Sequence, residues 1–250
     1  MAIIDVHAEI GTTPLWGIPF TDANLARSMQ KYGVERCIVS STLGNSCDFK
    51  RGNAQVAKVV QANNSLLGYV IVNINYPEQS QKDMHSYLGT DSFAAILLTS
   101  GTRGKHVTLA EGEELLNAHR RFIKPVFLHT YNTESLIAAN EMAKAFPGMK
   151  FVLLAMGEED WRMATVLAEK TLNLVLEVSG SFSPDKIKFA VEHIGSHRIV
   201  YGSGLPYVDP SATIGLVEDA DISDADKRNI FENSAKRLFG WSRSASSAAK

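Results

Sequence analysis

A short strand-like run followed by a helix-like segment occurs eight times along the 250 residues of this chain. Each run is apolar and rich in β-branched residues, whereas the segment after it carries apolar residues at intervals of three and four. The predicted strands are residues 2–9, 36–41, 66–73, 93–99, 125–130, 150–156, 172–179 and 198–203. The predicted helices are residues 21–32, 52–62, 78–87, 109–122, 133–145, 160–170, 184–193 and 223–239.

Strict alternation of strands and helices predicts parallel strands joined by right-handed crossovers. Eight such units favour closure into a barrel, and the apolar runs are typical of strands covered on both faces. The rival is a doubly wound open sheet, but no glycine-rich phosphate loop follows the first strand. We predict an α/β fold, a single (β/α)8 TIM barrel over residues 1–241. Residues 242–250, rich in Ser and Ala, are predicted to be a flexible C-terminal tail.

Three polar residues are placed to cap predicted helices. Thr21, Ser183 and Ser223 each stand at the start of a helical segment, and Pro184 follows Ser183 at the favoured first helical position. These residues therefore predict where the first, seventh and eighth helices begin.

The charge balance excludes some classes of partner. The formal net charge is −2, which gives no general attraction to nucleic acid or anionic lipid. No apolar run approaches the roughly 20 residues that span a bilayer, and the first residues do not resemble a secretory signal. We expect a cytoplasmic protein with no nucleic-acid or membrane partner and a small-molecule ligand in the barrel mouth.

Polar residues occur where the predicted strands end, which is where such barrels carry functional side chains. His7 and Glu9 are two residues apart on the first strand, so their side chains point to the same face. His129 ends the fifth strand. Further polar residues at or just beyond strand ends are Tyr131, Glu177, Ser203 and Tyr207.

Two interpretations of these residues remain open from their types and positions. His7, Glu9 and His129 could supply two imidazoles and one carboxylate to a divalent metal such as zinc. The same side chains could instead satisfy one another as a hydrogen-bonded cluster without metal. Spacing alone favours the cluster.

The opening strand also resembles a known family. Residues 3–11, Ile-Ile-Asp-Val-His-Ala-Glu-Ile-Gly, are similar to the first strand of amidohydrolase-related proteins (amidohydrolase family 2), which include decarboxylases of the aminocarboxymuconate-semialdehyde type. The resemblance continues through 73–77, 125–130, 150–157 and 202–206 and ends at 229–240, so it covers nearly the whole chain. It implies a metal-dependent hydrolase or carbon–carbon lyase of small carboxylated or cyclic substrates.

The family pattern is incomplete in this chain. The first strand of the family reads His-x-His; His7 matches the first histidine, Glu9 replaces the second, and His129 matches the histidine of the fifth strand. Where the family reads His-x-Gly, this chain has Ala155 in place of the substrate-polarising histidine. Where it reads Gly-Ser-Asp-x-Pro, this chain has Gly204 in place of the acidic ligand or base. Neither replacement can bind metal or transfer a proton through its side chain.

These departures leave two functions to distinguish, and both assume that the standard metal chemistry is lost or altered. The first is a rearranged enzyme in which His7, Glu9 and His129 form a facial metal set. Glu9 and Glu177 would then be catalytic, with Asp209 as another proton-transfer candidate, and Tyr131, Ser203 and Tyr207 would line the substrate pocket. The second is a non-catalytic barrel that binds a ligand or supports a partner, either as a homodimer or with a related subunit.

Overall fold

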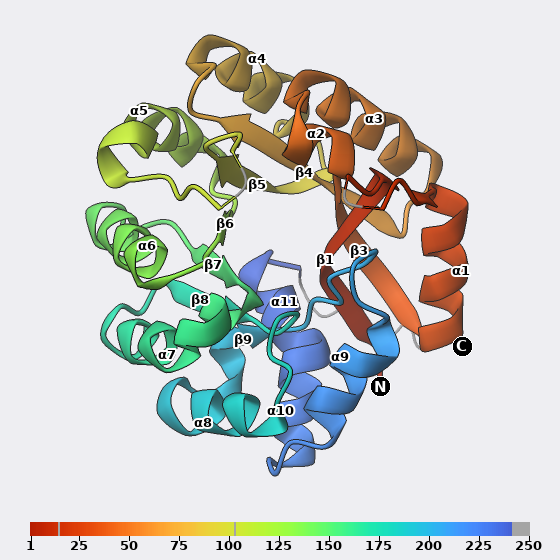
Figure 1. Ribbon diagram of the computed structural model, residues 1–250, viewed down its shortest axis with the longest axis vertical. Coiled ribbons are helices and arrows are strands. Elements are labelled where there is room, and N and C mark those ends of the chain that lie inside the picture. The colour runs from red at the N-terminus through yellow and green to blue at the C-terminus, as the bar shows by residue number, and fades with distance from the viewer. Residues whose placement is uncertain (15, 103, 242–250) are drawn as a thin grey trace, which may run out of the picture.

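A ring of parallel strands enclosed by helices forms the body of the protein (Figure 1). The computed structural model describes residues 1–14, 16–102 and 104–241. Within them, one sheet has the order β2-β1-β3-β4-β5-β6-β7-β8-β9. The strands are β1 (Ile3–Thr12), β2 (Pro19–Phe20), β3 (Val34–Ser41), β4 (Leu66–Asn73), β5 (Phe93–Thr99), β6 (Val126–His129), β7 (Phe151–Leu154), β8 (Leu174–Glu177) and β9 (Ile199–Val200).

Helices follow the strands and form the outer layer of the barrel. The α-helices are α1 (Asp22–Tyr32), α2 (Thr42–Ser46), α3 (Phe49–Ala62), α4 (Pro77–Tyr87), α5 (Leu109–His119), α6 (Thr133–Ala145), α7 (Trp161–Lys170), α8 (Pro184–Ile194), α9 (Pro210–Glu218), α10 (Asp224–Arg228) and α11 (Ser234–Leu238). Short 3-10 turns lie at Arg120–Phe122, Ala155–Asp160 and Ser196–Arg198, and a π-helical turn lies at Asn229–Asn233.

Backbone hydrogen bonds between β1 and the segment that continues β9 close the ring. The Val6 amide donates to the Tyr201 carbonyl at 3.0 Å, and the Gly204 amide donates to the His7 carbonyl at 2.9 Å. Every strand pair is parallel except β1 with the two-residue β2. The predicted (β/α)8 barrel is therefore confirmed. The predicted tail, residues 242–250, lies outside the described residues.

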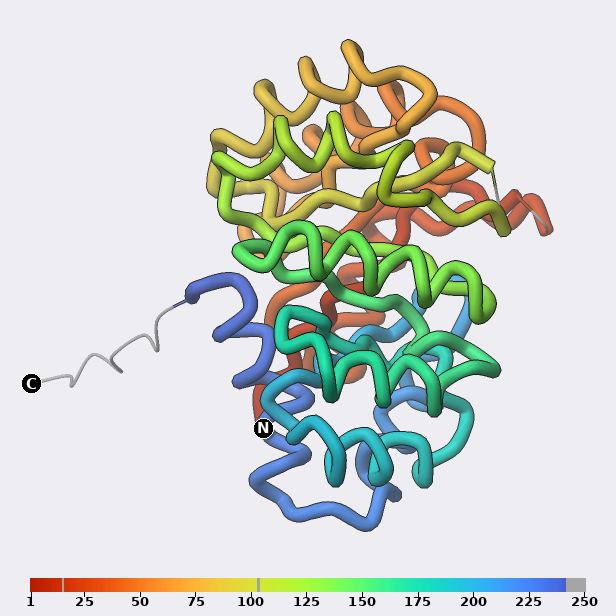
Figure 2. The backbone as a smooth tube through the Cα atoms, turned by 90° about the vertical axis from the view of Figure 1, so that its left-hand side faces the viewer, coloured from red at the N-terminus to blue at the C-terminus, as the bar shows by residue number. Residues whose placement is uncertain are grey.

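Two apolar clusters stabilise the barrel, a larger one involving the outer helices and a smaller one that reaches the last helix. In the smaller cluster the rings of Phe127 and Phe239 stack with centroids 6.4 Å apart, and Trp241 stacks on Phe239 at 4.8 Å. Figure 2 shows the last helix on one side of the barrel and the loop after β1 on the other. The end segment thus covers the bottom of the barrel and leaves the opposite end, the mouth, for function. No helix in the described ranges is long and apolar enough to cross a membrane.

Candidate functional site

A buried histidine–carboxylate pair lies at the mouth of the barrel. His7 on β1 has its Nδ1 atom 3.1 Å from Oε2 of Glu177, which ends β8. The same nitrogen lies 3.2 Å from the hydroxyl of Ser179. The His7 side chain is 15% exposed and that of Glu177 is 0% exposed. The pair therefore fixes the orientation of the imidazole ring from below.

Glu177 is surrounded by hydrogen-bond donors. Its Oε2 accepts from the Ser179 hydroxyl at 2.8 Å and from the Ala155 amide at 3.1 Å. Its Oε1 accepts from the Ser179 amide at 2.6 Å. Gly202 leaves the space that this carboxylate needs, because a Cβ atom there would lie 2.1 Å from Oε1. Glu177 is thus built into the fold as the partner of His7.

The surroundings of His7 favour its protonated form. Burial by itself lowers the pKa of His7, but the negative charge and hydrogen bond of Glu177 outweigh it, with smaller contributions from Glu9 and Asp5. The pKa of His7 is therefore raised above its usual value. The mouth thus presents an imidazole whose protonated form is stabilised by a buried carboxylate.

Asp5, which the sequence did not single out, supports this strand from beneath. Its Oδ1 accepts from the backbone amides of His7 at 3.0 Å and Ser203 at 2.9 Å. Burial raises the pKa of Asp5 to about 6, although these hydrogen bonds oppose the rise. The register of β1 against β3 shifts between Asp5 and Ala8. Such bulges are frequent beside active sites because they re-aim side chains.

Glu9, two residues after His7 on β1, contacts neighbouring loops. Its Oε1 accepts from the side-chain amide (Nδ2) of Asn45 at 2.8 Å, and its Oε2 accepts from the Tyr207 hydroxyl at 3.3 Å. The side chain is buried. Tyr207, which is partly in solvent, also packs against Trp16 with ring centroids 6.1 Å apart. Glu9, Tyr207 and Trp16 thus form one wall of the mouth.

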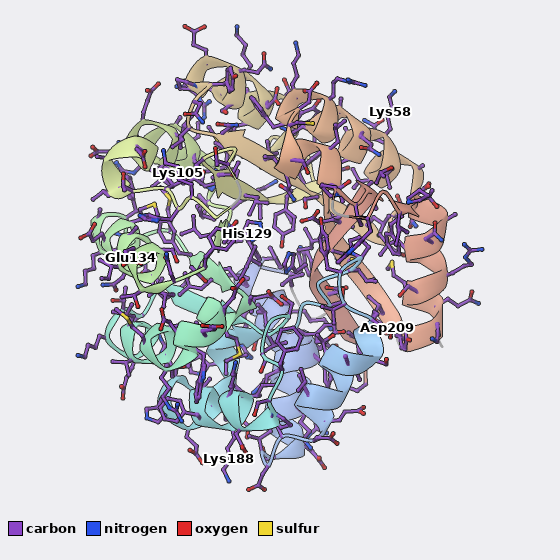
Figure 3. All side chains as sticks on the ribbon, viewed as in Figure 1. Lys58, Lys105, His129, Glu134, Lys188 and Asp209 are labelled. Carbon is purple, nitrogen blue, oxygen red and sulfur yellow. The ribbon has the colours of Figure 1, made fainter. Side chains whose placement is uncertain are left out.

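His129 stands near the centre of the ring of strands (Figure 3). Its ring lies 6.1 Å from that of His7 and stacks on Tyr131 at 5.8 Å, measured between centroids. His129 and Tyr131 also line a cavity of about 20 Å³, together with Lys105 and His106. That volume holds about one water molecule.

Two other predicted residues lie away from the open mouth. Ser203 is completely buried, where its hydroxyl donates to the His7 carbonyl and accepts from the Leu205 amide. Asp209 is exposed on the outer surface, caps α9 and accepts from the Tyr32 hydroxyl at 2.7 Å. Hydrogen bonds from Ser211 and from the Tyr32 hydroxyl lower the pKa of Asp209 to about 2. Figure 3 labels Asp209 on a different part of the barrel from His129, and proton transfer by Asp209 stays a prediction.

The segment after β7 has an unusual backbone. Ala155, Met156, Gly157 and Glu158 all have positive φ angles, between 51° and 83°. Residues other than glycine rarely adopt this left-handed backbone conformation. Segments that do so cluster at functional sites. Gly204, which follows β9 and lies beside Ser179, also has a positive φ of 74°. The two positions that lack the family's functional side chains are therefore both in left-handed backbone.

The donor atoms described at the mouth belong to His7, His129 and Glu9. His7 and His129 approach each other, but the Glu9 carboxylate is held by Asn45 and Tyr207, and positions 155 and 204 offer no side-chain donor. Over the described residues, no group of three or more His, Cys, Asp or Glu side chains is arranged to hold a metal ion. Catalytic zinc sites use three protein ligands. Of the described side chains, His7 and His129 are therefore the imidazoles that could hold a metal ion, with the Glu9 carboxylate already hydrogen-bonded within the protein.

Comparison with known proteins identifies the family. A family profile described as Amidohydrolase matches residues 18–241. The chain belongs to the amidohydrolase family. The match covers most of the barrel, and it confirms the resemblance carried by the strand-end motifs.

Solved structures of decarboxylases share the fold over nearly the whole chain. 2,6-Dihydroxybenzoate decarboxylase from Rhizobium has a TM-score of 0.80 and 15% sequence identity, covering 96% of this chain and 99% of that chain. 5-Carboxyvanillate decarboxylase from Sphingomonas paucimobilis has a TM-score of 0.75 and 15% identity, covering 96% and 99%. A dihydroxybenzoic acid decarboxylase from a Polaromonas species, solved with manganese and the inhibitor 2-nitroresorcinol, has a TM-score of 0.75 and 18% identity, covering 97% and 98%. At these identities the likeness establishes the fold.

Proposed function

We propose that this protein is a divergent amidohydrolase-family barrel that takes a small carboxylated or cyclic molecule at its mouth without the family's metal chemistry. The observation that carries the proposal is the incomplete donor set. Ala155 and Gly204 have no side-chain donor, and the nearest carboxylates, Glu9 and Glu177, are already hydrogen-bonded within the protein. An acid–base group, His7, remains.

The class of ligand follows from the side chains that remain at the mouth. In its protonated form, which its surroundings favour, His7 offers a positive charge and a hydrogen-bond donor to a carboxylate. Trp16, Tyr207, Tyr131 and His129 offer aromatic faces on which a ring can stack. The fold neighbours that act on dihydroxybenzoate and carboxyvanillate support the same class.

Each mouth residue then has a stated role. His7 Nε2 is the atom that would exchange a proton with the ligand, because Nδ1 is held by Glu177. Glu177 and Ser179 are positioning residues, since their oxygen atoms contact His7 and lie below it. Glu9 holds Tyr207 in place and stays a candidate for proton transfer.

A non-catalytic, ligand-binding or partner-supporting barrel is the second candidate. The small cavity beside His129 favours it, since about 20 Å³ is far less than a drug-sized ligand fills. The two candidates differ in what His7→Asn does. Loss of turnover with binding retained indicates an enzyme, whereas binding with no turnover in either protein indicates the second candidate.

Metal analysis tests the proposal directly. The protein, purified without chelator, is assayed for manganese, zinc and iron beside His129→Ala. We expect negligible metal in both proteins, and binding of hydroxybenzoates that chelator does not change. About one metal ion per chain, lost in His129→Ala, would overturn the proposal. Tyr207→Ala should weaken hydroxybenzoate binding, whereas Lys58→Ala on the outer surface should not.

A further inference from the structure

Two neighbouring helices on the outer surface carry the same order of charges. On α4, Glu78, Gln81 and His85 follow one another at spacings of three and four residues. On α5 and the turn after it, Glu114, Asn117 and Arg121 do the same. Spacings of three and four place side chains on one face of a helix. Each helix therefore runs from an acid through an amide to a base.

The two rows lie side by side. α4 and α5 are adjacent in the outer layer, and both return from the mouth towards the bottom of the barrel (Figure 1). Gln81 donates to Glu114 across the pair at 2.8 Å. A groove of about 640 Å³ between the helices is lined by Gln81, His85, Asn117 and Arg121. The combined surface, called the α4–α5 face, is acidic near the mouth and basic near the bottom.

The basic end carries more cationic side chains than the fold pairs. Arg120 and Arg121 are exposed at this end, and Lys82 lies further along α4, in a hollow that Glu78 and His85 also line. Neither arginine nor Lys82 takes part in an ion pair within the part of the chain that the structure describes. Arg121 contacts His85 and lies over the Phe122 ring at 4.9 Å. The helix dipole by itself favours cations at a helix C-terminus, so these charges have a reason within the single chain as well.

Exposed apolar side chains at both ends give a second, independent observation. Ile123 is 88% exposed and has a φ of 53°, and Tyr76, which precedes α4, is 60% exposed. A β-branched residue in the left-handed region is a genuine outlier, and glycine at this position would carry no such strain. The Ile123 side chain gains almost nothing by burial within this chain. The fold itself therefore gives no reason for isoleucine at this position.

We propose that the α4–α5 face is the interface of a two-fold homodimer. In a two-fold interface the same patch meets itself, and an axis that lies in the interface plane and runs across the helices reverses their directions between the two copies. The acidic residues Glu78 and Glu114 of one copy then face the basic residues His85 and Arg121 of the other. Tyr76 of each copy comes to the end of the patch that carries Ile123. A second copy thus matches both the charge and the apolar ends, independently of what the mouth binds.

Charge reversal on the full chain tests the interface by sedimentation. We expect the unaltered protein to be a dimer that added salt weakens, since exposed charge pairs are screened. Arg121→Glu and Glu114→Arg should each raise the dissociation constant about tenfold or more. The double variant restores opposite charges across the two-fold axis and should recover dimerisation. Lys58→Glu on α3 is the control and should change nothing.

The outcomes decide between this face and others. A monomer at every concentration, or a dimer that Arg121→Glu leaves unchanged, overturns the proposal. Ile123→Gly tests the apolar part of the interface without altering charge. It should weaken the dimer while it raises the thermal stability of the dissociated chain, because the strained conformation is relieved. A variant that merely unfolds would lower that stability instead, and circular dichroism identifies it.

Discussion

Asp5 and His7 are two residues apart on β1, yet their surroundings favour opposite charge states. His7 gains the charge of Glu177, so its protonated form is stabilised. Asp5 gains backbone hydrogen bonds and the nearby charge of His7, but burial outweighs them. The raised pKa of about 6 means that the Asp5 carboxylate is held ionised at neutral pH at a cost to stability.

Replacing Asp5 by asparagine should stabilise the protein above pH 6. The folded pKa exceeds the unfolded value of 3.8, so the favourable contribution of the neutral acid is complete below pH 3.8 and lost as pH rises through about 6. The asparagine side chain stays neutral and keeps an oxygen for the amides of His7 and Ser203. We expect the free energy of unfolding at pH 7.5, measured with urea, to rise by about 1–3 kcal/mol in Asp5→Asn.

A second variant at this position separates charge from hydrogen bonding. Asp5→Leu removes the acceptor as well as the charge, which leaves two buried amide donors without it. We expect this variant to be less stable than the unaltered protein. An Asp5→Asn protein no more stable than Asp5→Leu would contradict the account of Asp5 as an acid penalised by burial.

Strand-end positions made some site residues predictable and others not. His7, Glu9, His129 and Glu177 stand at or near the ends of apolar runs, and the barrel brings them to one mouth. Tyr207 was also predicted, but its hydrogen bond to Glu9 was not, and Asn45 was missed because it reaches the site from a loop whose path sequence periodicity does not describe. Asp5 did leave a signal, namely an acid inside an apolar strand, which must be buried and hydrogen-bonded.

At the scale of elements, β4, β5 and α6 have the predicted bounds because their apolar periodicity is continuous. Prediction failed where backbone geometry departs from regular periods. The predicted strand at 150–156 ends at Leu154, since Ala155 begins the left-handed segment. The predicted helix at 223–239 is broken by a π-helical turn, and α9 after β9 was not predicted. Propensities do not encode these conformations.

The helix caps give a matched pair of variants. Thr21 accepts from the Asn24 amide in a reciprocal capping box, whereas Ser183 starts α8 without any side-chain cap hydrogen bond. Thr21→Ala should therefore lower the free energy of unfolding by about 1 kcal/mol, and Ser183→Ala by much less. Chemical denaturation of both proteins checks this. Equal losses would mean that the hydrogen bond at Thr21 is not what stabilises α1.

At the scale of the whole molecule, two buried groups in different parts of the barrel have opposite effects on stability as the pH falls. Protonation of one stabilises the fold, and protonation of the other destabilises it. His119, at the end of α5, has its Nε2 2.7 Å from the Lys124 carbonyl, and its Nδ1 has no hydrogen-bond partner in the described part of the chain. Burial lowers the pKa of His119 to about 4. The fold favours the neutral form of His119. The contribution of this residue to the free energy of unfolding is therefore present above pH 6.5 and lost as pH falls through about 4.

Asp5 and His119 therefore offset each other between about pH 4 and 6, and single variants should expose each one. In Asp5→Asn, His119 is the only one of the two groups that still titrates. The free energy of unfolding should therefore fall by about 3 kcal/mol between roughly pH 6.5 and 4. In His119→Gln it should instead rise by a similar amount as pH falls through the range in which Asp5 is protonated. The double variant should lose both slopes. Urea unfolding across this range measures them, and four parallel curves would show that neither group controls the acid stability of the barrel.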